Sequence, residues 1–225
     1  MHRTRVKVCC MMSVTETEVA VALGADALGL VGPMPSGPGV IEDETAARLA
    51  SAVSPPIATF LLSSETTADG LAAHAQRVGP TALQVVSHIE PAEYEHLEAL
   101  LPRTRIKRVQ VIHVEGWEAV DLIDVYAEHV DAFLLDSGQP SAGVPKLGGT
   151  GRRHDWDVSA RFVKRSPIPV FLAGGLRPEN VGEAIAKVKP FGVDLCTGVR
   201  TNDHLDPDKL HRFMFSVAEA DRSLA

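Results

Sequence analysis

The chain has 225 residues, of which 45% are hydrophobic and 23% are charged, which is sufficient to bury the core of one domain. Asp and Glu (29) outnumber Lys and Arg (22), so the formal net charge is −7. This balance argues against nucleic acid or an anionic membrane as a partner, because both require a basic face. No run approaches the ~20 apolar residues of a membrane span. No signal peptide follows the basic N-terminus, so we predict a cytoplasmic protein.

The cysteine and histidine patterns indicate neither a metal site nor a disulfide framework. The three cysteines, Cys9, Cys10 and Cys196, are an odd number without Cys-x-x-Cys spacing, in a chain large enough to fold without disulfides. The nine histidines show no spacing such as His-Glu-x-x-His. We therefore expect free thiols and no metal, with His154 and His204 as solvated or secondary loop residues.

Short apolar runs alternate with longer amphipathic stretches along the whole chain. The runs lack polar alternation, which is typical of parallel strands that helices cover on both faces. In chain order, the predicted strands are Val6–Cys10, Ala27–Val31, Ile57–Leu62, Ala82–Val86, Ile106–Ile112, Ala132–Leu135, Val170–Ala173 and Val193–Thr197. The predicted helices that follow them in turn are Thr15–Leu23, Asp43–Ala52, Thr66–Val78, Pro91–Leu101, Trp117–Glu128, Trp156–Lys164, Pro178–Val188 and Pro207–Ala218.

Capping residues support several of these helix boundaries. Ser13 is placed to cap the first helix, and Gly24 and Gly79 lie just past helix ends, where a left-handed residue is needed. Three prolines stand where a first helical turn tolerates a missing N–H group, namely Pro91, Pro178 and Pro207.

Eight strands alternating with eight helices predict an α/β fold. An open, doubly wound parallel sheet would show a similar alternation. The even number of strands and the lack of any stretch for a second domain favour a barrel. We therefore predict that residues 1–225 form a single (β/α)8 barrel of the TIM type, whose chemistry would lie at the C-terminal ends of the strands.

Two side chains at predicted strand ends could carry acid–base chemistry. Asp136 directly follows an apolar strand, where partial desolvation would raise its pKa and suit a general acid. The alternative is an Asp that only caps a loop. Cys9 could act as a thiolate base, with Lys7 on the same strand face lowering its pKa, although a buried Cys that packs as a small hydrophobe is commoner. By strand alternation we expect Cys10 to face the helices.

Glycines follow the last three predicted strands. The segments are Leu147–Gly151, Gly174–Gly175 and Thr197–Gly198. None has the Gly-Lys-Ser/Thr ending of a P-loop. Glycines let backbone N–H groups approach a phosphate closely, and many barrels bind phosphate after strands 7 and 8. Together the three segments predict a phosphorylated ligand.

Several segments of the chain resemble phosphoribosylanthranilate isomerase, a (β/α)8 enzyme of tryptophan biosynthesis. The resemblance spans nearly the whole chain and is strongest in its C-terminal part. The matching segments are Val6–Cys9, Gly24–Leu30, Leu134–Asp136, Gly148–Gly151 with Asp155–Trp156, Leu172–Val181, Phe191–Asp194 and Thr197–Val199.

The resemblance implies an Amadori rearrangement of a phosphoribosyl amine, without cofactor or metal. It assigns Asp136 as the general acid that protonates the ribose ring oxygen, and Cys9 as the general base that removes a proton from the adjacent carbon. It places the phosphate on backbone N–H groups near Gly149, Thr150, Gly151, Gly174, Gly175, Thr197 and Gly198. Further expected substrate contacts are Lys7, Gln84, His113, Asp194 and Arg200. The expected partner is a small phosphorylated substrate, bound by a monomer or a homodimer.

The sequence departs from the family pattern at the other end of the substrate. Cys10 stands where a glycine usually follows the catalytic cysteine. The loop after the second strand lacks the usual arginine for the anthranilate carboxylate, and the fourth strand ends in Val86-Ser87 where the family has His-Gly. His113 stands where an arginine is common, and Arg200 where an acidic residue is usual.

Three interpretations follow from these departures. The first is an isomerase for phosphoribosylanthranilate in which Arg200 or His113 replaces the missing arginine. The second is a related isomerase for another phosphorylated sugar or amine. The third, a non-catalytic barrel that binds a phosphorylated metabolite, is disfavoured because phosphate binding requires neither Cys9 nor Asp136.

Overall fold

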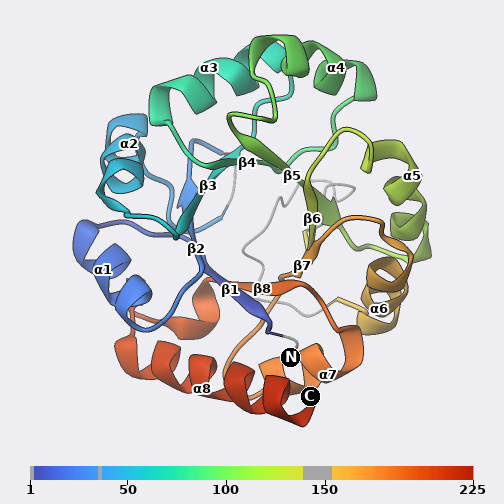
Figure 1. The fold of residues 1–225 in the computed structure, drawn as a ribbon. Helices are drawn as coiled ribbons and strands as arrows, with labels where there is room; N and C mark the ends of the chain where they lie inside the picture. Colours follow the sequence, from blue (N-terminus) through green and yellow to red (C-terminus); the bar gives the residue numbers. More distant parts are fainter. Residues whose placement is uncertain (1–2, 35–36, 139–153, 225) are drawn as a thin grey trace.

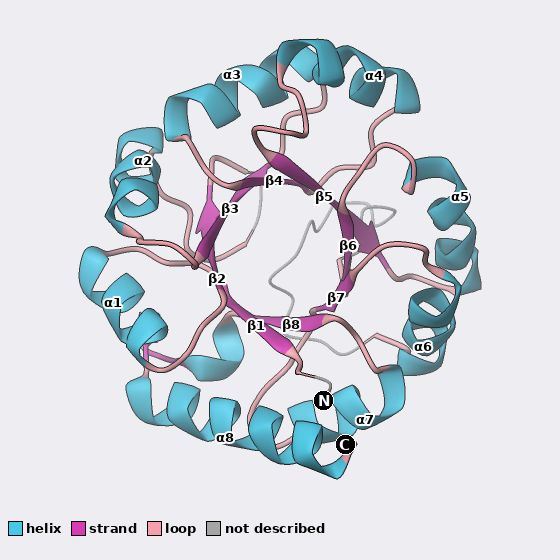
Figure 2. Cartoon of the chain, viewed as in Figure 1, coloured by secondary structure: helices cyan, strands magenta, loops and turns pink. Residues whose placement is uncertain are grey.

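Eight parallel strands close into a barrel in the computed structural model, and helices surround it (Figures 1 and 2). The structure describes residues 3–34, 37–138 and 154–224. The strands are β1 (Arg5–Val8), β2 (Ala27–Val31), β3 (Ala58–Ser63), β4 (Ala82–Val85), β5 (Lys107–His113), β6 (Ala132–Asp136), β7 (Val170–Leu172) and β8 (Gly192–Leu195). Each strand pairs with the next and β8 pairs with β1, so the predicted (β/α)8 barrel is confirmed.

Most of the helices begin within two residues of the predicted starts, and α8 extends beyond its predicted end at Ala218. They are α1 (Val14–Ala22), α2 (Asp43–Ala52), α3 (Ala68–Val78), α4 (Pro91–Leu100), α5 (Leu122–Tyr126), α6 (Trp156–Arg165), α7 (Val181–Val188) and α8 (Pro207–Ser223). Ser13 caps α1 by accepting a hydrogen bond from Glu16 N, and Gly79 ends α3 in the left-handed conformation, with φ 68°. Pro91 and Pro207 occupy the first turns of α4 and α8, as expected.

Two helix predictions need correction. The stretch predicted as one helix from Trp117 is a 3-10 helix, η1 (Trp117–Asp121), followed by the short α5. The prediction that a helix starts at Pro178 is wrong, because α7 begins at Val181. The Asn180 side chain accepts a hydrogen bond from Arg177 N and donates one to the Gly175 carbonyl, which folds this segment into a turn.

A small hairpin after β8 was not predicted. The 3-10 helix η2 (Thr197–Val199) leads into the antiparallel pair β9 (Arg200–Thr201) and β10 (His204–Leu205). The turn between them passes through Asn202 and Asp203, both left-handed at φ 49° and 63°. Strands of two residues carry no periodicity that a sequence pattern could reveal.

The core has two parts. The larger lies between the sheet and the helices, and the smaller fills the inside of the barrel. The inner part comprises alternate residues of the strands, as expected for side chains that point to opposite faces of a sheet. Its members include Ala27, Phe60, Leu62, Ala82, Val109, Val111, Ala132, Leu134 and Phe171.

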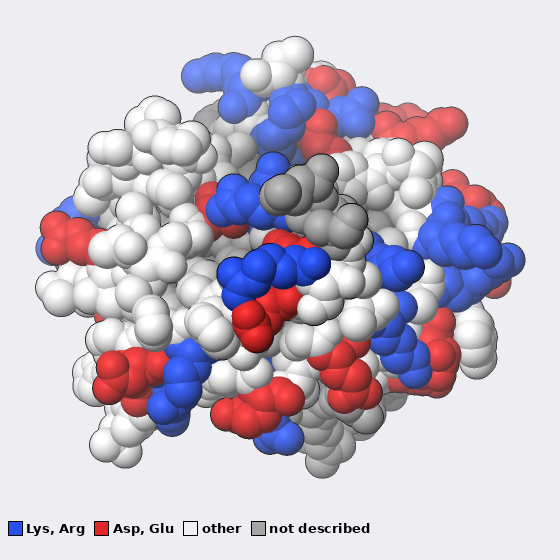
Figure 3. All heavy atoms as spheres, turned by 60° about the horizontal axis from the view of Figure 1, so that its bottom comes forward, with Lys and Arg blue, Asp and Glu red and all other residues white. Residues whose placement is uncertain are grey.

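The described surface carries both signs of charge. In the face shown in Figure 3, acidic side chains lie beside most of the basic ones. None of the described helices combines the length and hydropathy that crossing a membrane requires.

Candidate active site

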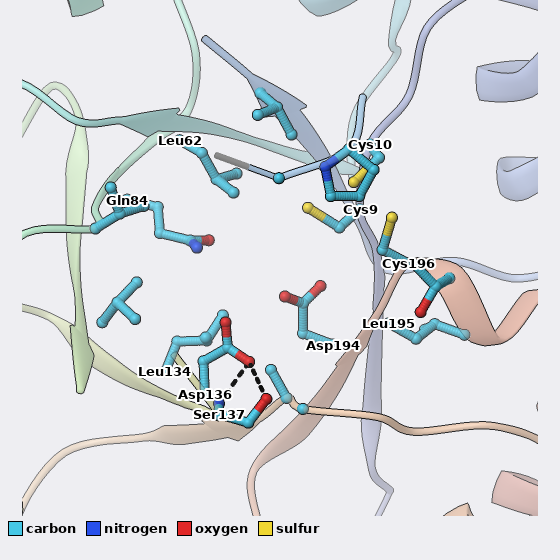
Figure 4. A pocket seen from close by; sticks show the side chains of 18 of the residues that line it. Cys9, Cys10, Leu62, Gln84, Leu134, Asp136, Ser137, Asp194, Leu195 and Cys196 are labelled. Atoms are coloured by element: carbon cyan, nitrogen blue, oxygen red, sulfur yellow. Dashed lines mark hydrogen bonds between the residues drawn. The ribbon is translucent and has the colours of Figure 1, made fainter. Parts of the chain in front are cut away.

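A pocket opens at the C-terminal ends of the strands, where barrel enzymes carry their chemistry. Four of its residues come from four separate strand ends: Cys9 after β1, Gln84 on β4, Asp136 on β6 and Asp194 on β8. Their side chains point into the same space in Figure 4. The structure therefore brings together four residues that were predicted from the sequence at widely separated positions.

Asp136 is the last residue of β6 and faces the pocket. Its Oδ1 accepts a hydrogen bond from Ser137 N at 2.7 Å, drawn in Figure 4. Burial raises the pKa of the Asp136 carboxyl above its ordinary value, against the opposing effects of Ser137 and the Lys7 ammonium. A raised pKa keeps this carboxyl protonated closer to neutral pH, which is what a general acid requires.

Cys9 lies across the pocket from Asp136 and is buried. Gly29 in β2 makes room for it, because a Cβ at that position would lie 2.5 Å from the Cys9 Sγ. The pKa of the Cys9 thiol is lowered by the adjacent Cys10 side chain and by the nearby Lys7 ammonium, although burial alone would raise it. A lowered pKa favours the thiolate, the form of cysteine that can accept a proton.

A buried ion pair supports this end of the barrel. Lys7 Nζ lies 2.9 Å from Asp194 Oδ1, and the Lys7 side chain is fully buried. Burial disfavours the ammonium, yet Asp194 and the neighbouring cysteines hold the pKa of Lys7 above its ordinary value. Asp194 lines the pocket, whereas Lys7 is not one of its lining residues. The geometry thus gives Lys7 a supporting place beneath the site and does not show the substrate contact expected for it.

The prediction that Cys10 faces the helices is wrong. Its side chain lines the same pocket as Cys9, because β1 ends at Val8 and Cys10 adopts a left-handed conformation with φ 67°. Strand alternation no longer applies beyond the end of the strand. Cys196 lines the pocket as well, so the three cysteines gather at one edge of it (Figure 4).

The glycines after β7 and β8 form the neighbouring wall. Gly174 and Gly175 are left-handed, with φ 87° and 64°, and both line the pocket together with Thr197. A Cβ on Gly198 would lie 2.0 Å from the Leu176 carbonyl oxygen, so η2 packs directly against the loop after β7. The other predicted phosphate-binding residues, Gly149, Thr150 and Gly151, lie outside the described residues.

Gln84 is buried and directs its amide into the pocket (Figure 4). Among the described residues, no group forms a hydrogen bond with its Oε1. A buried polar atom of this kind is normally satisfied, so the arrangement suits a ligand that brings a hydrogen-bond donor.

The structure does not bring His113 and Arg200 to the pocket lining. His113 Nε2 is 2.8 Å from the Val86 carbonyl oxygen, and burial lowers the pKa of the ring, which favours its neutral form. Arg200 Nη1 is 3.1 Å from Glu16 Oε1, and its guanidinium also donates to the Cys10 and Asp203 carbonyls. Both side chains are therefore engaged within the protein, and the expected contact of either one with a substrate carboxylate stays a prediction.

Two polar residues in or beside the pocket have positions that the sequence did not predict. Ser137 lines the pocket beside Asp136. His154, expected to be solvated or secondary, is half-buried, with Nε2 2.7 Å from Ser159 Oγ. Its ring lies against the turn at Gly174, and burial lowers its pKa to about 4. A loop position without a recognisable motif offers no sequence signal for such a contact.

Nothing in the described part of the chain resembles a metal centre, since no group of three or more His, Cys, Asp or Glu residues there could hold a metal ion.

Comparison with known proteins places this geometry in one family. Residues 7–215 match the family model for N-(5'-phosphoribosyl)anthranilate (PRA) isomerase. The N-(5'-phosphoribosyl)anthranilate isomerase of Haloarcula marismortui is 36% identical over 222 residues, covering 96% of this chain and 97% of the relative. The solved structure of phosphoribosyl anthranilate isomerase from Thermococcus kodakaraensis is 33% identical, with a TM-score of 0.76 over 95% of this chain and 98% of that chain.

A third similar protein was solved with a ligand. It is a phosphoribosyl anthranilate isomerase in complex with reduced 1-(o-carboxyphenylamino)-1-deoxyribulose 5-phosphate, 26% identical, with a TM-score of 0.76 over 96% of this chain and 99% of that chain. On the match to the family model and the similarity to its curated members, the chain belongs to the N-(5'-phosphoribosyl)anthranilate isomerase family.

Proposed function

We propose that this protein catalyses the Amadori rearrangement of N-(5'-phosphoribosyl)anthranilate, with Asp136 as general acid and Cys9 as general base. The observation that carries the assignment of roles is that these two side chains face one pocket from opposite strands, with pKa values shifted in opposite directions. Groups whose environments separate their protonation states in this way are suited to divided acid and base roles. Membership of the isomerase family supports the choice of reaction.

The proposed reaction moves protons between these two groups and the sugar. The Asp136 carboxyl donates its proton to the ribose ring oxygen as the C1–O bond breaks, which opens the ring and leaves a protonated imine at C1. The Cys9 thiolate then removes the proton from C2, and the electrons of that C–H bond form an enolamine. Tautomerisation of the enolamine gives the 2-ketose with a secondary amine at C1.

The glycine-lined wall is the proposed phosphate site. Left-handed turns such as Gly174–Gly175 expose consecutive backbone N–H groups, and the start of η2 at Thr197 lies beside them. Gln84 and Asp194 face the middle of the pocket, where the sugar hydroxyl groups would lie between the phosphate and the reacting carbons. This arrangement supports a phosphorylated sugar amine as the substrate.

A related isomerase for another phosphorylated amine is the second candidate. The observation that favours it is that His113 and Arg200 are engaged within the protein. Neither offers a free cation for an aromatic carboxylate.

The test is an isomerase assay with freshly prepared phosphoribosylanthranilate, followed by the loss of its fluorescence. We expect turnover by the wild type, and a fall in kcat of about 10²- to 10⁴-fold in both Asp136→Asn and Cys9→Ala, the range for loss of a general acid or base. Asp69→Asn, an exposed aspartate on α3, is the matched control that retains activity. Turnover unaffected by both site variants would contradict the assigned roles. A folded wild type without turnover on this substrate, but active on another phosphoribosyl amine, would favour the second candidate.

A further inference from the structure

Arg200 and Glu16 form a buried ion pair between two segments that lie 184 residues apart in the sequence. Arg200 begins β9, and Glu16 lies in the first turn of α1. Their side chains are only 6% and 11% exposed. Arg200 Nη1 lies 3.1 Å from Glu16 Oε1, and Nη2 lies 3.2 Å from Oε2. A pair with two such parallel contacts fixes the orientation of both segments as well as their distance.

The same pair holds the backbone that follows Cys9. The Arg200 guanidinium donates to the Cys10 carbonyl, and Glu16 accepts a hydrogen bond from Met12 N at 3.1 Å. The regular strand β1 has ended before these residues. Cys10 is left-handed, with φ 67°, a conformation that a residue other than glycine keeps only where the surrounding structure holds it. The ion pair supplies that support at the residue next to Cys9.

The hairpin side of the pair is fixed as well. Arg200 Nη1 donates to the Asp203 carbonyl at 2.6 Å, and Lys209 Nζ on α8 donates to the Arg200 carbonyl at 2.8 Å. Glu16 accepts a second backbone hydrogen bond, from Leu205 N at 2.9 Å. The hairpin therefore gives the guanidinium a rigid support from which to hold the segment after β1.

Both members of the pair are charged in this environment. Burial alone would raise the pKa of Glu16, but hydrogen bonds from Arg200 and from two backbone amides hold it below its ordinary value. Burial alone would lower the pKa of Arg200, but Glu16 keeps it above its ordinary value. The pair is therefore ionised at neutral pH, and hydrogen bonds from a charged donor are stronger than those between neutral groups.

A direct contact with a ligand is the competing role for Arg200. Together with Met12 and Asn202, Arg200 lines a hollow that shares Pro38 and Thr197 with the active-site pocket. The two roles predict different kinetics. Loss of a ligand contact raises KM, whereas displacement of a catalytic group lowers kcat.

We propose that Arg200 and Glu16 are positioning residues for the isomerase reaction, whose ion pair holds the Cys10 carbonyl and the Met12 amide and thereby places the Cys9 sulfur against the reacting carbon. The inference rests on the proposed role of Cys9 as the general base. It gives a role to an arginine at a position where the resembling family usually has an acidic residue.

The first test is to measure kcat and KM for Arg200→Lys and for the double variant Arg200→Met/Glu16→Gln. Lysine keeps the charge beside Glu16 but lacks the planar fork that reaches several acceptors at once. The double variant leaves neither charge buried without its partner, so it should be more stable than Arg200→Met alone. We expect kcat to fall about 10- to 100-fold in both, with KM within about threefold of the wild-type value. A raised KM with kcat retained would overturn the proposal and assign a ligand contact to Arg200.

Arg108→Met is the matched control for the loss of a buried arginine. Arg108 is 2% exposed, lies 2.8 Å from Glu98 and donates to the Tyr94 and Leu101 carbonyls. It lies near the start of β5, away from the pocket lining. Its replacement should lower the free energy of unfolding while kcat of the folded protein stays unchanged. An equal fall in kcat in Arg108→Met would overturn the proposal, since the effect would then follow from lost stability alone.

A second measurement separates this proposal from the proposed function. Hydrogen exchange of the Met12 amide, followed by NMR, requires no turnover. We expect it to become about tenfold faster in the double variant, the equivalent of one hydrogen bond. Unchanged exchange would reject the hold on this segment. Faster exchange with unchanged kcat, while Cys9→Ala is inactive, would reject the positioning role. Faster exchange with an active Cys9→Ala would instead reject Cys9 as the base and retain the hold on its neighbours.

Discussion

The two ends of the barrel interior differ sharply in chemistry. Near the N-terminal ends of the strands, Phe60 and Phe171 pack edge to face, with ring centroids 5.8 Å apart among small and branched apolar side chains. Near the C-terminal ends, the Lys7–Asp194 ion pair is buried instead, and Asp136 is half-buried. Apolar packing stabilises the fold, whereas burying charge costs stability unless each group keeps its partner. Apolar packing near the N-terminal ends of the strands thus offsets the cost of holding reactive groups near their C-terminal ends.

The largest expected effect comes from breaking the buried ion pair. Lys7→Met leaves the Asp194 carboxylate buried without its cation, and we expect a loss of about 3–5 kcal/mol in the free energy of unfolding, measured with urea. The double variant Lys7→Met/Asp194→Leu should recover most of this loss, since it removes both charges. A double variant no more stable than the single one would contradict the account.

The next largest effect on stability is expected from protonation of His154 at acid pH. With its pKa lowered from 6.5 to about 4, the neutral ring favours folding above pH 6.5, and this contribution is lost as the pH falls toward 4. This difference between the two pKa values corresponds to at most about 3 kcal/mol in the free energy of unfolding. His154→Gln should therefore flatten the decline of unfolding free energy between pH 7 and 4. Parallel curves for the wild type and the variant would contradict this assignment.

The left-handed glycines allow a matched pair of substitutions. Gly174→Ala and Gly79→Ala each place a side chain at positive φ, 87° and 68°, and each should cost about 1–2 kcal/mol of stability. Only at Gly174 would the new Cβ also press on a side chain that lines the pocket, 3.2 Å from Ser137 Cβ. We expect KM to rise about tenfold, the equivalent of one hydrogen bond, in Gly174→Ala alone. An equal rise in KM for both variants would remove Gly174 from the proposed phosphate site.

The smallest effect is expected at the apolar end. Phe171→Leu loses the edge-to-face contact with Phe60 and should cost about 1 kcal/mol of stability. Because Phe171 does not line the pocket, kcat/KM should stay within about twofold of the wild-type value, as volume-conserving core changes usually allow. A large loss of activity without unfolding would show that the two ends of the interior are coupled.

The barrel could be predicted because strands that are buried on both faces leave a regular apolar pattern in the sequence. Asp136 could be predicted because it directly follows such a run and Cys9 because it lies at the end of one, and strand ends meet at one edge of the barrel. The predicted helix boundaries are less accurate where side chains form local hydrogen bonds with the backbone. The turn that Asn180 forms delays α7 beyond the proline that would otherwise begin it.

The remaining features depend on contacts between distant segments. The orientation of Cys10 follows from a left-handed backbone that Arg200 holds across 190 residues. The sequence predicts Arg200 as a substrate ligand, because its partner Glu16 lies far away in the sequence. No local pattern distinguishes an arginine that binds a ligand from one that is paired with a glutamate distant in the sequence.

The central claim is that the reactive groups at the C-terminal ends of the strands lower the stability of the protein. It is tested most directly by urea unfolding of Asp136→Asn as a function of pH. Asparagine keeps the oxygen that accepts from Ser137 N but cannot ionise. Because burial raises the pKa of Asp136, the wild type should lose stability as the pH rises through that value. We therefore predict a variant with strongly reduced activity that is more stable than the wild type at pH 7, with the difference in unfolding free energy shrinking toward acid pH. A variant less stable than the wild type at pH 7, or a difference independent of pH, would contradict the account.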